Sequence, residues 1–463
     1  MRSRPLVQAD SREAGSFWYV ALAALVAATS GLLFGFDIAV INGAIIFLRQ
    51  QFQLTEVQTE LAASSLLVGC IFGASVGGWL SDRSGRRKIL MLSAVLFAVS
   101  SVWAALPRNL NEFMLARFTG GLAIGMASLL APLYIAEVAP ARSRGRLVSL
   151  NQMAIVTGIL LAYFINWSLS YLGPNAWRWM FASAAVPSAV FLIALFFVPE
   201  SPRWLTEVGR ETEALRVLTR VNGRPVAIAV LEEIRNAIRE ETGALSELLQ
   251  PGLRRATGLA LALAILQQIT GINTVLFYGS VIFKEQVGGQ SDTAAIGYNV
   301  AVGVVNFLAT IAALMVIDRL GRRPLLMFST CMMALCQAAL GAAFLLQPPP
   351  VYLVLAIMLV CVASFAVGLG PGTWVLLAEI FPNRVRGRAM SIATVALWTA
   401  CFTLTVTFLT LVSWLGATGA FWVYSSMCVL EFLILWRWLP ETKGKTLEQI
   451  EEFWKAALPA GRH

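Results

Sequence analysis

The sequence predicts an all-α membrane protein in which twelve transmembrane helices form two six-helix halves, with a helical insert on the cytoplasmic side. Three observations support this prediction. Of the 463 residues, 58% are hydrophobic and only 13% are charged, a balance that excludes a soluble globular protein. Most of the Lys and Arg fall on alternate connections between apolar segments, as the positive-inside rule requires. Several charged motifs also occur twice, at corresponding places in the two halves.

Apolar segments of about 20 residues or more, enough to cross a bilayer as a helix, recur along the whole chain. An even number of spans places both tails on one side, and the basic connections place that side in the cytoplasm. The net charge of +9 reflects this topology and does not indicate nucleic-acid binding. The polar N-terminal segment shows no cleavable signal peptide. The predicted spans are 17–48, 60–80, 88–106, 113–136, 147–171, 177–198, 254–283, 293–317, 324–346, 351–378, 389–412 and 418–438.

A polar insert separates the sixth span from the seventh. It contains helical charge patterns such as Leu231-Glu232-Glu233-Ile234-Arg235, so we expect short helices that form a solvated cap without a ligand of its own. The predicted organisation is an N-terminal half (1–199), this cytoplasmic linker (200–255), a C-terminal half (256–440) and a cytoplasmic tail (441–463).

Three pairs of motifs mark the internal repeat, each pair separated by about 240 residues. Such collinear matches indicate two equivalent halves. We expect their acidic residues and arginines to pair across helix ends as a cytoplasmic gate, with a purely topological role as the alternative. The predicted gate residues are Asp82, Arg83, Glu137, Arg144, Asp318, Arg319, Glu379 and Arg386. The pairs are Asp82-Arg83-Ser84-Gly85-Arg86-Arg87 with Asp318-Arg319-Leu320-Gly321-Arg322-Arg323, Glu137-x-x-Pro140 and Arg144-Gly145-Arg146 with Glu379-x-x-Pro382 and Arg386-Gly387-Arg388, and Pro199-Glu200 with Pro440-Glu441.

The seventh span carries the polar segment Gln267-Gln268-Ile269-Thr270-Gly271-Ile272-Asn273 inside an otherwise apolar run. We expect one continuous helix here, with both glutamines near one face and Thr270 and Gly271 on that face one turn later. Carboxamides are costly in hydrocarbon unless they face protein or water. They donate and accept hydrogen bonds without carrying a charge, which suits a neutral ligand rich in hydroxyls, such as a sugar. Hydrogen bonding between helices is the alternative role.

These motifs together resemble a known family. The duplicated Asp-Arg-x-Gly-Arg-Arg resembles the signature loop of the major facilitator superfamily. The other motifs resemble its sugar porter family, which includes bacterial proton–xylose symporters and mammalian glucose facilitators. The resemblance covers nearly the whole chain and implies the major facilitator fold, with a sugar site at mid-membrane that opens alternately to each side. The matching motifs are Gly35-Phe36-Asp37, Glu137-Val138-Ala139-Pro140, Pro199-Glu200-Ser201-Pro202-Arg203-Trp204, Gln267-Gln268-x-x-Gly271-x-Asn273 and Pro440-Glu441-Thr442-Lys443-Gly444.

The resemblance also implies roles for individual residues. Carboxamides would contact the sugar and tryptophans would supply flat apolar walls. Three positions depart from the family pattern, because Ile159 and Leu397 replace amides and Phe277 replaces a tyrosine. We therefore expect a drier pocket than the family pattern implies. The residues carried over as sugar contacts are Gln152, Gln267, Gln268, Asn273, Asn306, Trp374 and Trp398.

Two opposite charges fall inside predicted spans of the N-terminal half, Asp37 in span one and Arg117 in span four. Charges inside a membrane are costly, so they are expected to be paired or functional. The proton-coupled members of the family resemble this chain at both positions, whereas the facilitators have an amide in place of the Asp. We therefore expect Asp37 and Arg117 to couple proton movement to transport. Glu431, in the last span, is an acid that the family pattern does not predict, and we expect it to face a cytoplasmic cavity.

The predicted function is proton-coupled symport of a monosaccharide, either a hexose or a pentose. A facilitative sugar uniporter is the nearest alternative, and the two differ in whether sugar addition moves protons. A transporter-like sugar sensor is disfavoured, because such sensors need a long signalling tail and only a short segment follows the last span.

We predict no enzymatic activity, cofactor or metal site. The sequence shows no metal cluster, nucleophile–base pair or phosphate-binding loop, and its six cysteines lie in apolar segments without metal-ligand spacing. The expected partners are the sugar, the proton and the lipid bilayer. We expect a monomer in a bacterial inner membrane with both termini in the cytoplasm.

Overall fold

The computed structural model describes residues 16–140, 143–240, 245–250, 253–288, 290–381, 383–439 and 441. Across this described part the regular structure is helical. Eleven helical stretches are long and apolar enough to cross a membrane. The last contains Gly416, whose φ of 69° interrupts the helix, so this stretch supplies two spans. The predicted count of twelve spans follows.

The N-terminal helices precede the insert and supply the first six spans. Span six consists of two short helices, because Pro187 has no backbone N–H and is accommodated in the first turn of the second one. The N-terminal helices are α1 (Phe17–Phe52), α2 (Glu56–Ser84), α3 (Arg86–Ala105), α4 (Leu110–Val138), α5 (Arg144–Leu169), the 3₁₀ turn η1 (Ser170–Leu172), α6 (Ala176–Ala182) and α7 (Ala185–Leu195).

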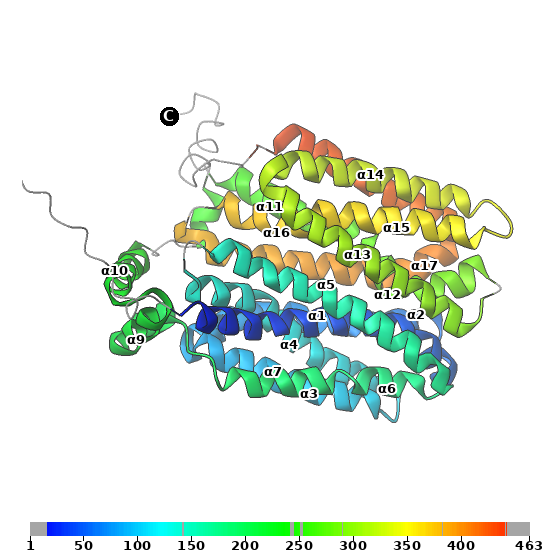
Figure 1. The fold of residues 1–463 in the computed structure, drawn as a ribbon. Helices are drawn as coiled ribbons and strands as arrows, with labels where there is room; N and C mark the ends of the chain where they lie inside the picture. The colour runs from blue at the N-terminus through cyan, green and yellow to red at the C-terminus, as the bar shows by residue number, and fades with distance from the viewer. Residues whose placement is uncertain are drawn as a thin grey trace, which may run out of the picture.

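The insert forms short helices beyond one end of the bundle, where Figure 1 shows α9 and α10. They share a small apolar core that includes Trp204, Leu218 and Leu231. Trp204 Nε1 donates a hydrogen bond to the backbone oxygen of Asp82 at 2.8 Å, which ties the insert to α2. We call this end of the bundle the insert end and the opposite end the far end. The insert comprises α8 (Pro202–Glu207), α9 (Glu211–Asn222), α10 (Arg224–Glu240) and the 3₁₀ helix η2 (Leu245–Leu249).

The C-terminal helices follow the insert and supply the last six spans. Two of the spans predicted as single helices are broken, the seventh at Gly271 and the tenth at Gly368, where the backbone leaves the helical region. The C-terminal helices are α11 (Arg254–Ile269), α12 (Ile272–Val281), the π-helix η3 (Ile282–Val287), α13 (Asp292–Leu320), α14 (Arg322–Ala343), α15 (Val351–Val367), α16 (Leu369–Ile380) and α17 (Asn383–Trp438).

Glycines allow neighbouring helices to approach very closely. A Cβ atom at Gly35 would lie 1.9 Å from the backbone oxygen of Ile155, and one at Gly158 would lie 2.0 Å from that of Leu32. Helices α1 and α5 therefore pack backbone against backbone, and Gly121 permits the same contact between α4 and α2. Small residues at such crossings are typical of membrane helix bundles, where dispersion contacts replace the hydrophobic effect as the driving force.

Candidate functional site

The predicted polar segment lies at a break between α11 and α12, not within one continuous helix. Gly271 has a φ of 87°, which residues with a Cβ rarely adopt. A Cβ there would also lie 2.7 Å from the ring of Tyr424 and 2.8 Å from Gln337 Nε2. Gln337 Nε2 donates at 2.9 Å to the backbone oxygen of Thr270, beside the break. The expectation of a continuous helix is therefore wrong, because packing against α14 and α17 imposes a conformation that hydropathy does not reveal.

The three amides of this segment form a hydrogen-bonded series. Gln267 Nε2 donates to the backbone oxygen of Leu369 at 2.8 Å, and Gln268 Nε2 donates to Gln267 Oε1 at 3.0 Å. Asn273 Nδ2 donates to Gln268 Oε1 and to the sulfur of Cys401. All three amides are buried. Gln267 thus joins α11 to α16, whereas the bond between Gln268 and Asn273 joins two side chains and can be exchanged for bonds to ligand hydroxyls.

The other four predicted sugar contacts come from helices packed around this segment. Helix α5 packs against α13, and α11 packs against α16 and α17. Gln152 in α5 and Trp374 in α16 are half-buried, whereas Asn306 in α13 and Trp398 in α17 are buried. Trp398 meets Phe34 of α1 edge to face, with 5.5 Å between the ring centroids. The seven predicted contacts therefore lie partly on helices that precede the insert in the sequence and partly on helices that follow it.

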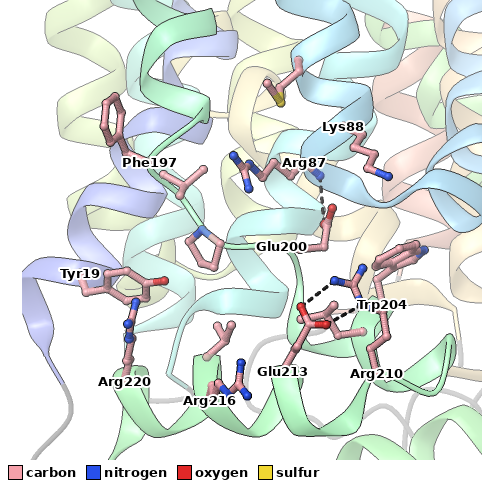
Figure 2. A pocket seen from close by; sticks show the side chains of 15 residues that line it. Tyr19, Arg87, Lys88, Phe197, Glu200, Trp204, Arg210, Glu213, Arg216 and Arg220 are labelled. Atoms are coloured by element: carbon pink, nitrogen blue, oxygen red, sulfur yellow. Dashed lines mark hydrogen bonds and ion pairs between the residues drawn. The ribbon is translucent and has the colours of Figure 1, made fainter.

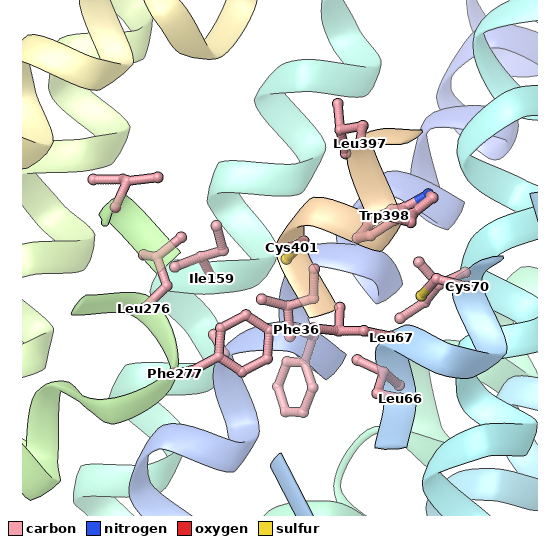
Figure 3. Packing of buried hydrophobic residues seen from close by; sticks show 14 of the residues in the cluster. Phe36, Leu66, Leu67, Cys70, Ile159, Leu276, Phe277, Leu397, Trp398 and Cys401 are labelled. Carbon is pink, nitrogen blue, oxygen red and sulfur yellow. The ribbon is translucent and has the colours of Figure 1, made fainter. Parts of the chain in front are cut away.

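An apolar cluster adjoins the amide series (Figure 3) and contains Phe36 from α1 together with side chains from α2, α5, α12 and α17. Ile159, Phe277 and Leu397, which are the three departures from the family pattern, all belong to this cluster and are buried. Asn273 contacts the same cluster through the sulfur of Cys401 at 3.3 Å. A ligand held by the amides would therefore meet an apolar wall, as the three substitutions predict.

The two predicted intramembrane charges form an ion pair. Arg117 Nη1 lies 2.5 Å from Asp37 Oδ1, and Nη2 donates to the backbone oxygen of Asp37 at 2.8 Å. Arg117 is fully buried and Asp37 is nearly so. Gly120 leaves room for the carboxylate, because a Cβ there would lie 2.9 Å from Asp37 Oδ2. The pair joins α1 to α4, so a change in the packing of these two helices would change the contact between the charges.

The sequence matches the profile of a family described as "Sugar (and other) transporter" over residues 23–454. This match reaches from α1 to beyond α17. The chain belongs to the sugar transporter family.

Known relatives of this sugar transporter match over almost its whole length. The arabinose-proton symporter of Bacillus subtilis (strain 168) is 40% identical over 446 residues, which cover 95% of this chain and 96% of that protein. The galactose-proton symporter of Escherichia coli (strain K12) is 39% identical over 450 residues, covering 96% and 95%.

A solved structure of a xylose transporter shows the same fold. It is XylE from E. coli in a partially occluded inward-open conformation, with a TM-score of 0.83, 36% identity and coverage of 93% of this chain and 100% of that one. The predicted family and the twelve-helix major facilitator fold are confirmed. The protein is a multi-pass integral membrane protein, and its relatives are transporters, not enzymes.

Hydrogen bonds between the N-terminal and C-terminal helices of this transporter gather at the far end. Asn42 in α1 is their centre, and its side chain is buried. Its Nδ2 donates to the backbone oxygens of Val275 at 3.1 Å and Leu276 at 2.9 Å, and to Asn299 Oδ1 at 3.3 Å. Its Oδ1 accepts from the backbone N–H of Ser280 at 3.1 Å. One side chain therefore satisfies backbone groups on α12 and a side chain on α13.

Further contacts join the two sets of helices at the same end, among them an ion pair between Arg49 in α1 and Glu285 in η3. Tyr163 in α5 donates to the backbone oxygen of Leu276 at 3.1 Å. Glu60 in α2 accepts from the backbone N–H and the hydroxyl of Thr410 at 2.7 and 2.8 Å. The sequence alone did not predict these roles for Asn42, Tyr163 and Glu60. Polar side chains in otherwise apolar spans were the available signal, but their partners are hundreds of residues away.

The repeated motifs form two equivalent ion-pair networks at the insert end. Arg86 lies 3.0 Å from Asp82 and 3.2 Å from Glu137. In the second repeat Arg322 lies 3.1 Å from Glu379. The ion pair with Glu137 joins α3 to α4, which both precede the insert. The ion pair with Glu379 joins α14 to α16, which both follow it. Arg86 and Arg322 were not among the predicted gate residues, although both belong to the repeated motifs.

A second pair of contacts repeats in the same way. Glu200 Oε1 accepts from the backbone N–H of Arg87 at 3.0 Å, and Glu441 Oε2 accepts from that of Arg323 at 3.2 Å. These carboxylates satisfy free backbone donors at the starts of α3 and α14, where negative charge is also favoured by the helix dipole. The third repeated motif is thus a pair of helix caps.

The remaining predicted gate residues have other surroundings. Arg83 lies over the ring of Trp79, 4.1 Å from its centroid. Arg144 is exposed, and the structure gives it no ion pair with any described residue, whereas Arg86 is the arginine that pairs with Glu137. Arg319 is exposed. The side chains of Asp318 and Arg386 lie outside the described part of the structure.

Glu431 in α17 is fully buried, so the expectation that it faces a cytoplasmic cavity is wrong in this structure. Neither of its carboxyl oxygens has a hydrogen-bond partner in the described part of the chain. A buried carboxylate without a partner is costly. The site therefore does not resemble the paired charge of Asp37.

Proposed function

We propose that this protein is a proton-coupled symporter for a monosaccharide, either a hexose or a pentose, and that it works by alternating access. Its relatives include symporters for arabinose and galactose and a transporter for xylose. The observation that carries the proposal is the buried ion pair of Asp37 and Arg117, because a paired charge inside the membrane, in a protein that also has an uncharged amide site, suits a proton and a neutral solute.

The sugar is bound by the amide series and its aromatic surroundings. The amides donate and accept hydrogen bonds as a ring of hydroxyls requires, and the apolar cluster that contains Phe277 and Leu397 faces the C–H surface of the sugar. The proposed binding residues are Gln152, Gln267, Gln268, Asn273, Asn306, Trp374 and Trp398. The apolar wall favours a sugar whose hydroxyls lie mainly on one edge.

The proton is carried by Asp37. While Arg117 contacts the carboxylate, its guanidinium balances the negative charge at 2.5 Å. When α1 and α4 move apart, a proton can replace the guanidinium as the partner of the carboxylate. One conformation then binds the proton and the other releases it, so sugar and proton cross together.

Alternating access requires two bodies that rock about the sugar. We assign these to the N-terminal half (1–199) and the C-terminal half (256–440), connected by the linker (200–255), with 441–463 as the tail. The network around Asn42 closes the far end, which faces outward, and the ion pairs of the repeated motifs hold the insert end. A bacterial inner membrane with cytoplasmic termini, and a monomeric protein, fit this arrangement.

The test is transport in proteoliposomes. An inwardly directed proton gradient should drive accumulation of labelled arabinose, xylose or galactose above its external concentration. Asp37→Asn, which imitates the permanently protonated carboxyl, should abolish accumulation but retain counterflow of the same sugar. Glu56→Gln, the same change at an exposed carboxyl on α2, is the control and should accumulate sugar normally.

Two results would overturn the proposal. Accumulation by Asp37→Asn would exclude Asp37 as the proton site. Sugar counterflow without any proton-driven accumulation by the unmutated protein would identify a facilitative uniporter.

A further inference from the structure

A cavity lies at the insert end of the bundle (Figure 2). Its volume is about 570 Å³. It is enclosed by the start of α1 at Tyr19, the first turns of α3, the segment after α7 and helices α8 and α9. The cavity therefore lies where the membrane-spanning helices meet the insert.

The lining of this cavity is strongly basic. It contains five cationic side chains and two carboxylates, Glu200 and Glu213. Glu200 accepts from the backbone N–H groups of Arg87 and Ser201. Glu213 is held by a two-pronged contact with Arg210, at 2.8 and 2.6 Å. Both carboxylates are thus engaged, and the cavity keeps a net positive charge.

Three of the cations have no carboxylate partner among the described residues: Lys88, Arg216 and Arg220. All three side chains are exposed, and Arg220 lies over the ring of Tyr19. Figure 2 shows Arg216 and Arg220 on α9, on the opposite side of the cavity from Lys88 of α3. Guanidinium and ammonium groups that line one cavity without forming a direct ion pair favour a phosphate, which accepts several charge-assisted hydrogen bonds at once.

The cavity also has a lipid-facing rim. Phe197 lines it and is 72% exposed, and the neighbouring Phe196 is 59% exposed. Both follow α7, the last helix of span six, so these exposed rings lie at the end of a membrane span, where we expect lipid headgroups. Basic pockets between membrane helices on the cytoplasmic side are suited to anionic headgroups. A molecule with a phosphate and acyl chains would match both the cations and the aromatic rim.

We propose that this cavity binds a phosphate group, and that its position favours the headgroup of an anionic phospholipid over a soluble phosphate. A lipid bound there would contact α3 and α9 together and hold the insert against the N-terminal helices. This role is separate from sugar recognition, since none of the predicted sugar contacts lines the cavity.

The test compares two charge-matched double variants of the full-length protein. Arg216→Gln with Arg220→Gln removes two cations from the cavity. Arg224→Gln with Arg239→Gln removes two exposed cations from α10, outside the lining. Native mass spectrometry then measures binding of phosphatidylglycerol and of phosphatidylcholine with the same acyl chains. Each Lys or Arg near an anionic membrane surface contributes about fivefold in affinity, so the cavity variant should bind phosphatidylglycerol about 25-fold more weakly than the control variant.

A soluble arm identifies the source of the phosphate. Glycerol 1-phosphate and inorganic phosphate are added to the detergent-solubilised proteins, and thermal stability is recorded. Phosphatidylglycerol binding that depends on Arg216 and Arg220, without stabilisation by either soluble phosphate, supports the lipid site. Stabilisation by soluble phosphate that is lost in the cavity variant alone supports a phosphate site but overturns the lipid assignment. Equal behaviour of the two double variants in both arms overturns the proposal.

Discussion

Closure of the far end depends on the side chain of Asn42, and Asn42→Ala tests this directly. The change removes four polar contacts, to Val275, Leu276, Asn299 and Ser280, at 2.9 to 3.3 Å. Because Nδ2 carries only two hydrogens, these contacts amount to at most three full hydrogen bonds. A net hydrogen bond contributes about 0.5–1.5 kcal/mol, and water can replace these partners once the far end opens. The closed state should therefore lose about 1.5–4.5 kcal/mol relative to the open state. This loss corresponds to a shift of roughly 10- to 2000-fold in the ratio of the two states.

The assay is the distance between spin labels on either side of the far end. Gln51→Cys in α1 and Gln286→Cys in η3 place one label on each set of helices, in a background without the native cysteines. Electron–electron resonance should show a longer distance gaining population in Asn42→Ala. Amide hydrogen exchange at Ser280 in α12 should also accelerate, because its backbone N–H loses the bond that it donates to Asn42 Oδ1.

Asn166→Ala is the matched control. Asn166 is also buried, and its Nδ2 donates to the backbone oxygen of Val40 at 3.0 Å, but both residues belong to the N-terminal helices. This variant should be less stable to heat with the label distance unchanged. An unaltered distance distribution and unaltered exchange in Asn42→Ala would refute the reasoning, as would an equal distance change in Asn166→Ala.

Three further predictions follow from the site and its supports. Gln268→Ala and Asn273→Ala should each weaken sugar binding by about 1–3 kcal/mol, since each leaves buried sugar hydroxyls without partners. If calorimetry shows unchanged sugar affinity in both variants, these amides serve helix packing instead. Arg86→Gln should destabilise the protein by about 3–5 kcal/mol, because it leaves the buried carboxylate of Glu137 without its ion pair. Arg144→Gln should change the stability of the protein by less than about 0.5 kcal/mol. Thermal unfolding of the two variants side by side measures the difference, and equal stability would contradict the prediction. Glu431→Gln should leave proton-driven uptake intact and change stability by less than about 1 kcal/mol. The reason is that the amide keeps the shape of a side chain that makes no hydrogen bond with a described residue. Loss of proton-driven uptake with retained counterflow would instead make Glu431 a proton site.

Much of the fold could be predicted from the sequence because bilayers impose strong one-dimensional constraints. The length of each apolar run fixes the number of spans, and the placement of Lys and Arg predicts the sidedness. The repeated motifs predicted two equivalent networks, and the structure places Arg86 with Glu137 and Arg322 with Glu379 in matching ion pairs. Because charges are costly inside a membrane, the sequence predicted that Asp37 and Arg117 are paired or functional, and the structure shows that they form an ion pair.

The choice of partner within a motif was not determined by sequence. Arg86 and Arg144 both lie near Glu137 along the predicted helix ends, and only the packing of α3 against α4 selects Arg86.

By itself, then, the sequence determined which segments cross the membrane and which charges are expected to be paired, because these follow from composition and spacing along the chain. Tertiary structure decided what depends on contacts between distant segments. The turn at Gly271 exists because Tyr424 and Gln337 pack against it, and Asn42 closes the far end because α12 presents backbone oxygens to it. A single amide in an apolar span reveals that a partner is needed, but only the packed bundle determines which group meets it.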